Sequence, residues 1–166
     1  MKKLIFIGGP MGVGKTTLAK ELMKKMPNAV YLDGDWCWYT NPWILNEETR
    51  CIAAANAKDM LRRFIESNSY ETIIFTWILH EDSIIKDLTD SLPMNNVEFH
   101  NFSLIANEDT IVSRLKKDID SGLRPQIVIP RSKERLKHYA NVSSVHIDTT
   151  GLNKDDVVKK IYEIVK

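Results

Sequence analysis

One eight-residue segment near the start of the chain constrains the fold more than any other. Residues 9–16 read Gly-Pro-Met-Gly-Val-Gly-Lys-Thr and match the pattern G-x-x-x-x-G-K-[ST] at every fixed position. The short apolar run 4–7 precedes them, and Leu18, Leu22 and Met26 follow at helical spacing. A buried strand, a glycine-rich turn and a helix in this order favour a phosphate-binding loop over a glycine turn with only a structural role.

The residues of this loop have separate expected tasks. Glycine permits the backbone dihedrals that turn several N–H groups toward a phosphate, and the helix that begins near Lys15 adds its positive end. The Lys15 ammonium is expected to reach the β- and γ-phosphates of ATP, and the Thr16 hydroxyl to ligate Mg²⁺. The residues expected to contact the nucleotide here are Gly9, Met11, Gly12, Val13, Gly14, Lys15, Thr16 and Thr17.

Strand and helix patterns alternate along the whole chain. Asn107 is expected to cap a helix with Ile111, Leu115 and Ile119 inward, and residues 122–130 are expected to form a loop. Strands are predicted at 4–7, 29–32, 72–79, 97–105 and 145–147. Further helices are predicted at 15–26, 47–66 (with Ile52, Met60, Phe64 and Ile65 inward), 82–92, 131–140 and 153–165. This alternation predicts a doubly wound α/β domain spanning residues 1–166.

Composition excludes several classes of protein. The 166 residues are 43% hydrophobic and 27% charged, with a net charge of +1, which gives little support to nucleic-acid binding. Cys37 and Cys51 form no CxxC pair and indicate neither a zinc site nor a disulfide. The absence of a long apolar run predicts no signal peptide and no membrane span, so we expect a cytoplasmic protein.

Two carboxylates follow the second predicted strand. Asp33 and Asp35 flank Gly34, and strand alternation would point both side chains to a similar side. In an open parallel sheet, residues just beyond the carboxyl ends of strands line the ligand crevice. A solvated Asx turn is the alternative. Beside a phosphate loop, we expect Asp33 to hold Mg²⁺ through water and Asp35 to act as the general base toward an acceptor.

Basic residues are concentrated in one part of this nearly neutral chain. Residues 114–137 carry eight basic side chains against three acidic ones. This excess predicts a lid over residues 116–131 that closes on phosphates, although solvated helix faces would also explain it. The eight basic residues are Arg114, Lys116, Lys117, Arg124, Arg131, Lys133, Arg135 and Lys137.

An aromatic cluster follows Asp35 directly. Trp36, Trp38, Tyr39 and Trp43 fall within eight residues. They could form the apolar wall of a substrate site or pack a small local core, and both interpretations stay open.

Two strings near the end of the chain are typical of GTPases. They are residues 148–151, Asp-Thr-Thr-Gly, and residues 153–156, Asn-Lys-Asp-Asp. GTPase motifs of these types lie far apart in sequence, whereas these are adjacent. A turn at Gly151 followed by Asn153 as a helix N-cap is therefore the favoured interpretation.

Together these features resemble the superfamily of P-loop small-molecule and nucleoside-monophosphate kinases, including shikimate and gluconate kinases. The resemblance implies an AAA-type ATP-binding domain with three α/β/α layers and a five-stranded parallel sheet in the order 2-3-1-4-5. It also implies that Arg114 stacks on the adenine, because Arg114 matches the first arginine of the R-L-x-x-R lid helix. The loop around residues 149–152, with Thr150 and Gly151, would then lie near the base.

The chain departs from that family pattern at several positions. Asp118 stands where the second lid arginine belongs, so its role would pass to Arg124 or Arg131. Residues 76–78, Thr-Trp-Ile, replace the glycine-rich turn of shikimate kinases. The third strand has no terminal aspartate, which leaves Asp33 as the expected magnesium residue.

The sequence therefore predicts an ATP-dependent phosphotransferase that acts on a small molecule. Its expected catalytic residues are Lys15, Asp33, Asp35, Arg124 and Arg131, with Thr16 and Asp33 at the metal. The alternative is a nucleotide-binding ATPase or regulatory protein without a second substrate. The acceptor and the oligomeric state stay open.

Overall fold

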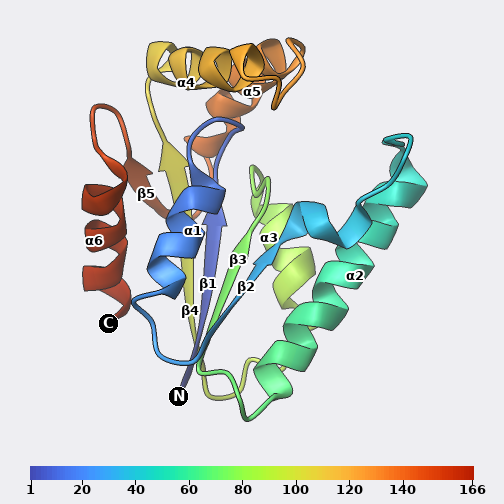
Figure 1. Cartoon of the computed structure of the whole chain (residues 1–166). Coiled ribbons are helices and arrows are strands. Elements are labelled where there is room, and N and C mark those ends of the chain that lie inside the picture. The colour runs from blue at the N-terminus through green and yellow to red at the C-terminus, as the bar shows by residue number, and fades with distance from the viewer.

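A computed structural model describes all 166 residues and contains one five-stranded parallel sheet. Its strand order is β2-β3-β1-β4-β5, which confirms the predicted order (Figure 1). The strands are β1 (Lys2–Gly8), β2 (Ala29–Asp33), β3 (Thr72–Thr76), β4 (Val97–Ile105) and β5 (Val145–Asp148).

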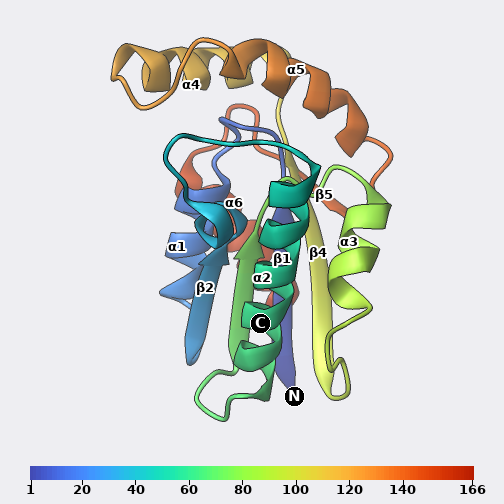
Figure 2. The same ribbon diagram turned by 90° about the vertical axis from the view of Figure 1, so that its right-hand side faces the viewer.

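Helices cover both faces of the sheet and its carboxyl edge. Helices α1 (Lys15–Met23) and α6 (Lys154–Val165) lie on one face, and α2 (Glu47–Glu66) and α3 (Asp82–Thr89) lie on the other (Figures 1 and 2). Helices α4 (Glu108–Asp120) and α5 (Val128–Tyr139) extend across the carboxyl ends of the strands. A short 3₁₀ helix, η1 (Gly34–Trp38), follows β2. No helix combines the length and the apolar character that a membrane crossing requires.

The central strand is buried on both sides, as its unalternating apolar run predicted. Ile5 and Ile7 pack in one core cluster with residues of α1 and α6, whereas Leu4 and Phe6 pack in a second cluster with residues of α2 and α3. Successive side chains of a strand point to opposite faces, so one four-residue run contributes to two cores.

Helix α2 buries a different stripe from the one expected. Ile52 and Met60, predicted to face inward, are 48% and 38% exposed. The buried residues recur every four positions and are Ala53, Ala57, Leu61 and Ile65. Small alanines let the helix approach η1 closely, so this stripe packs better than the one containing the larger Ile52. Of the predicted set, Ile65 is buried and Phe64 packs partly buried against the core.

Several element ends also differ from the prediction. β3 stops at Thr76 rather than at residue 79, so Trp77 and Ile78 belong to a loop. α5 begins at Val128, which places Pro130 in the first helical turn, where a missing N–H costs no intrahelical bond. The predicted N-caps are confirmed: the Asn107 side chain accepts from Thr110 N, and the Asn153 side chain from Asp156 N.

The stripe of α2 can be tested by a pair of truncations. Leu61→Ala should lower the free energy of unfolding by about 2–5 kcal/mol, because it leaves a cavity under a fully buried side chain. Ile52→Ala on the exposed side should change it by only about 0.5 kcal/mol. Urea denaturation of both variants measures the difference, and equal losses would contradict the observed orientation of the helix.

Candidate functional site

The phosphate loop is held from above by the two helices at the carboxyl edge. A Cβ on Gly12 would lie only 2.7 Å from Cγ of Leu115, so α4 packs directly on the loop backbone. From α5, the fully buried Ser132 donates a hydrogen bond of 2.7 Å to the Met11 carbonyl. The sequence pattern did not indicate Ser132. Both contacts fix the loop against the basic segment of the chain.

The Lys15 ammonium lies over its own loop. Nζ donates to the Gly9 carbonyl at 2.7 Å and to the Pro10 carbonyl at 3.0 Å. Burial lowers the pKa of Lys15 to about 8, although the Asp35 and Asp33 carboxylates act in the opposite direction. A phosphate charge beside this amine would strongly stabilise its protonated form, because burial has already removed much of the hydration of the ammonium.

Asp33 is held by two hydroxyl groups, and a third hydroxyl supports one of them. Thr16 Oγ1 and the Tyr31 hydroxyl donate to Asp33 Oδ2 at 3.1 and 2.9 Å. Thr76 Oγ1 lies 2.9 Å from the Tyr31 oxygen and can donate to it, since the phenol proton already points to Asp33. Burial raises the pKa of Tyr31, which keeps the phenol protonated as a donor. Sequence reasoning missed Tyr31, although its place two residues before Asp33 on one strand was a usable signal.

The backbone places Asp35 at the site in a different way from the one predicted. Asp33 Oδ1 accepts from Asp35 N at 3.1 Å and caps η1, so a 3₁₀ turn, not strand alternation, places Asp35. A Cβ on Gly34 would lie 2.4 Å from Cγ of Trp77, so an indole occupies the space beside the glycine. Although Asp35 keeps solvent contact, partial burial raises its pKa, Asp33 raises it further, and Lys15 opposes both.

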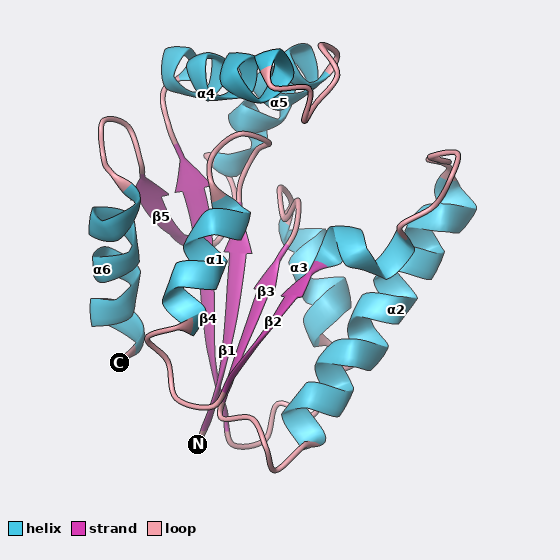
Figure 3. Ribbon diagram, viewed as in Figure 1, coloured by secondary structure: helices cyan, strands magenta, loops and turns pink.

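These groups meet in one cavity of about 330 Å³ at the carboxyl edge of the sheet. The loops that form it follow β1, β2 and β3 (Figure 3). Two lining residues, Trp77 and Ile78, come from the loop that was predicted to be strand. The lining residues are Met11, Gly12, Gly14, Lys15, Thr16, Thr17, Asp33, Asp35, Trp77, Ile78, Arg114, Asp118 and Arg124.

Arg114 separates this first cavity from a second one of about 300 Å³. Its guanidinium donates to the Val13 carbonyl at 3.2 Å, to Thr149 Oγ1 at 3.1 Å and to the Thr149 carbonyl at 3.1 Å. Val13, Thr149 and Leu152 are among the residues that line the second cavity.

The predicted Thr150 and Gly151 line neither cavity. Thr150 is turned away because its Oγ1 accepts from Asn107 N at 2.9 Å and its own N–H donates to Asp148 Oδ1 at 2.8 Å. Thr149 and Leu152, at the ends of the predicted segment 149–152, line the second cavity instead.

The two candidate lid arginines lie in different places. Arg124, in the loop between α4 and α5, lines the first cavity, and its Nε pairs with Asp118 Oδ2 at 3.1 Å. Arg131 is exposed and lines neither cavity, because it lies on the outer side of α5 one residue before the buried Ser132. Arg135, one turn further along α5, is half-buried and lines a third cavity.

The third cavity measures about 590 Å³ and shares Trp77 and Ile78 with the first. Of the aromatic cluster, only Trp38 lines it, whereas Trp36, Tyr39 and Trp43 are largely exposed. The cluster therefore divides between the two interpretations left open by the sequence. Trp38 is a cavity wall, and Trp43 packs on it with ring centroids 4.6 Å apart.

The loop, the sheet order and the covering helices define a P-loop nucleotide-binding protein. The AAA domain family model, AAA_18, matches residues 5–137, so the chain belongs to that family. A nucleotide-binding protein of Coprothermobacter proteolyticus is 23% identical over 185 residues, covering 99% of this chain and 55% of the relative. The chain thus spans about half the length of that relative.

Solved structures share the fold across nearly the whole chain. The tunicamycin resistance protein of Deinococcus radiodurans is 23% identical with a TM-score of 0.75, covering 99% of this chain and 96% of the other. A gluconokinase of Sinorhizobium meliloti is 17% identical with a TM-score of 0.70, covering 95% and 88%. Shikimate kinase of Acinetobacter baumannii is 18% identical with a TM-score of 0.65, covering 99% and 93%. The chain therefore has the fold of small-molecule kinases.

The state of Lys15 makes nucleotide binding dependent on pH. Lys15→Ala should weaken MgATP binding roughly 100-fold or more, since charge-assisted hydrogen bonds each contribute about 1.5–3 kcal/mol. In the unaltered protein, affinity should be level below the lysine pKa of about 8 and should fall as the amine loses its proton at higher pH.

Titration calorimetry between about pH 7 and pH 9 tests both statements, with circular dichroism as the control for folding. An unchanged affinity in Lys15→Ala would contradict the role of the ammonium. The same loss of affinity with pH in both proteins would show that another group titrates.

Proposed function

We propose that the protein is an ATP-dependent phosphotransferase that moves the γ-phosphate of MgATP to a hydroxyl of a small molecule. The observation that carries this proposal is the position of Asp35. It lies in the cavity that contains Lys15 and Thr16, and that cavity borders a larger one through Trp77 and Ile78. A carboxylate between a phosphate site and an apolar cavity is placed to serve a second substrate.

The proposed nucleotide spans the first two cavities. Its phosphates would occupy the first, near Lys15, and its adenine the second, against Arg114 and Leu152. A planar guanidinium held by three hydrogen bonds offers a flat face on which a base can stack.

The residues present fit a magnesium ion that arrives with the nucleotide. The Thr16 hydroxyl and the Asp33 carboxylate lie 3.1 Å apart, and no cluster of three or more acidic, histidine or cysteine side chains forms a separate metal site. Mg²⁺ is commonly held by one or two protein oxygens together with substrate phosphates. When bound, the ion would neutralise charge on the phosphates, while Tyr31 keeps Asp33 in place.

The proposed transfer proceeds in one displacement. The acceptor oxygen forms a bond to the γ-phosphorus, the bond from that phosphorus to the ADP oxygen breaks, and the hydroxyl proton passes to Asp35. The raised pKa of Asp35 suits a proton acceptor that must later release the proton to water. Lys15 and Arg124 would stabilise the charge on the transferring group.

The alternative is a nucleotide-binding ATPase or regulatory protein that has no second substrate. The Coprothermobacter proteolyticus relative is known as a nucleotide-binding protein, which accords with either function. The cavity beyond Trp77 favours the phosphotransferase, because an ATPase that activates only water has no need of it.

Substitution of the two carboxylates, one at a time, should have different effects. Asp35→Asn should lower phosphate transfer by about 10²–10⁴-fold, the usual contribution of a general base, while most of the nucleotide affinity is retained. Asp33→Asn should instead weaken the dependence of nucleotide binding on Mg²⁺. Coupled ADP-release assays with an active acceptor, together with calorimetry at varied Mg²⁺, distinguish the two. Full transfer activity in the Asp35→Asn variant would show that Asp35 is not the general base.

A closing lid over residues 116–131 should appear in hydrogen exchange. Arg124 sits in a loop that connects α4 to α5, and its Asp118 partner can be exchanged for a phosphate. An ATP analogue with Mg²⁺ should slow amide exchange in this segment, whereas amides in the middle of α6 serve as the control. Equal exchange in 116–131 with and without the analogue would contradict closure.

A further inference from the structure

We propose that the phosphoryl acceptor is a hydroxylated aromatic acid: a broad, flat apolar body in the third cavity, one anionic group at Arg135 and Arg50, and a hydroxyl directed to Asp35. This inference rests on the proposed phosphotransferase function and names the class of its substrate. It follows from the lining of the cavity, from the charges around it and from its connection to the phosphate site.

The lining favours an apolar body over a polyol. Seven of the thirteen lining residues are hydrophobic, among them Trp38, Trp77, Leu45 and Ile84. Hydroxyl groups of a sugar acid that face the apolar walls would lose water without gaining partners there, which is costly. The volume of about 590 Å³ is within the range of sites for drug-sized organic ligands.

The two indoles that line the cavity are braced from behind. Trp77 packs on Phe75 with ring centroids 6.1 Å apart, and on the backbone of Gly34, where no side chain separates them. Trp38 packs edge-on against Trp43. Rigid aromatic surfaces bind a planar ligand with little loss of side-chain freedom.

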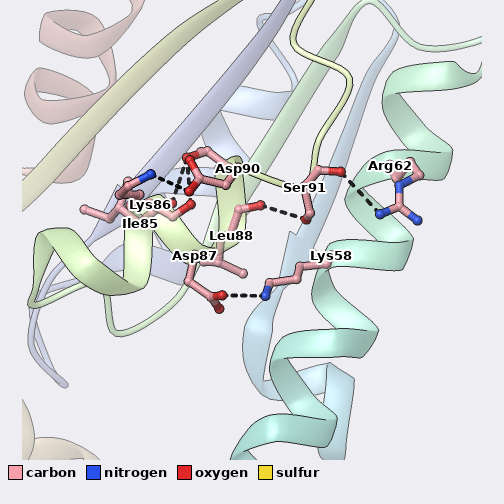
Figure 4. Close-up of polar contacts among 9 residues, drawn as sticks. Lys58, Arg62, Ile85, Lys86, Asp87, Leu88, Asp90 and Ser91 are labelled. Carbon is pink, nitrogen blue, oxygen red and sulfur yellow. Dashed lines mark hydrogen bonds and ion pairs between the residues drawn. The ribbon is translucent and has the colours of Figure 1, made fainter.

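Positive charge exceeds negative charge at this cavity. Of its two carboxylates, Asp87 pairs with Lys58 at 2.7 Å (Figure 4), whereas Glu81 keeps its charge, accepting from Ser83 at 3.2 Å and lying 3.5 Å from His80 Nε2. Arg50 and Arg135 also line the cavity, and neither forms an ion pair. A half-buried guanidinium such as Arg135 attracts an anion more strongly than an exposed one, because the surrounding dielectric is lower. Charge complementarity at Arg135 and Arg50 therefore favours an acid.

The helices on either side of the cavity, α2 and α3, are tied together at its edge and beyond it. Besides the pair of Lys58 with Asp87, Arg62 of α2 donates to the Ser91 carbonyl just beyond α3 at 3.2 Å (Figure 4). These contacts set the distance between the two helices before any ligand binds. Trp77 and Ile78 border both cavities, so a body in the third cavity can place a hydroxyl in the first, beside Asp35.

Binding of matched probes to the full chain tests the class of ligand. We expect hydroxynaphthoate to bind in the presence of Mg²⁺ and a non-hydrolysable ATP analogue, to quench tryptophan fluorescence, and to bind more tightly than uncharged dihydroxynaphthalene or polar gluconate. Arg135→Gln should weaken hydroxynaphthoate roughly 10- to 100-fold, as expected for a charge-assisted contact, and leave dihydroxynaphthalene unchanged. Lys137→Gln, an exposed charge change on the same helix, should alter neither affinity.

A second variant separates shape from charge. Trp38→Leu should weaken both naphthalene probes alike, because it removes an indole wall of the cavity and leaves the packing of Trp77 on Gly34 intact. The inference is overturned if gluconate binds as tightly as hydroxynaphthoate, or if Arg135→Gln changes neither probe.

Phosphate transfer is measured separately from binding by release of ADP. Binding of hydroxynaphthoate that depends on Arg135, without transfer to it or to related hydroxy acids, would refute the phosphotransferase and leave the class of ligand standing. Transfer to gluconate with no binding of hydroxynaphthoate would refute the class of ligand and leave the phosphotransferase standing.

Discussion

The parallel pairing of β1, β2 and β3 is the constraint on which the rest of the site depends. In register, Ile7 pairs with Thr76, and Thr76 with Asp33, so the three strands end at one level. Each chain segment that leaves this level carries a chemical group: the phosphate loop after β1, the carboxylates after β2 and the Trp77 loop after β3. Burial of β1 and β3 on both faces makes this edge rigid, which allows short loops to hold precise positions.

The price of this arrangement is unfavourable electrostatics in the free protein. Lys15 has lost much of its hydration, and Asp35 lies near the Asp33 carboxylate. Arg135 has no carboxylate partner. A ligand of the opposite charge, or a metal ion, would stabilise the charged form of each of these groups. Unfavourable electrostatics of this kind are typical of binding and catalytic sites.

Much of the fold could be predicted because the decisive signals are local. The apolar run 4–7, the glycine loop and the caps Asn107 and Asn153 each depend on neighbours within a few residues, and the structure contains all of them. The stripe of α2 could not be predicted in the same way. Its helix has two apolar faces, and the choice between Ile52 and Ala53 is made by how closely the helix meets η1.

The sequence by itself determined the phosphate loop and the two carboxylates beside the sheet, because spacing along the chain encodes both, while the order of the strands followed from the resemblance to P-loop kinases. The tertiary structure alone decided which side chains share a cavity. It brought Thr16 to Asp33 and Thr76 to Tyr31, placed Arg124 and not Arg131 at the first cavity, and set Trp77 against Gly34. The physical reason is that these contacts join separate elements, so they depend on sheet register and helix packing, which no local pattern records.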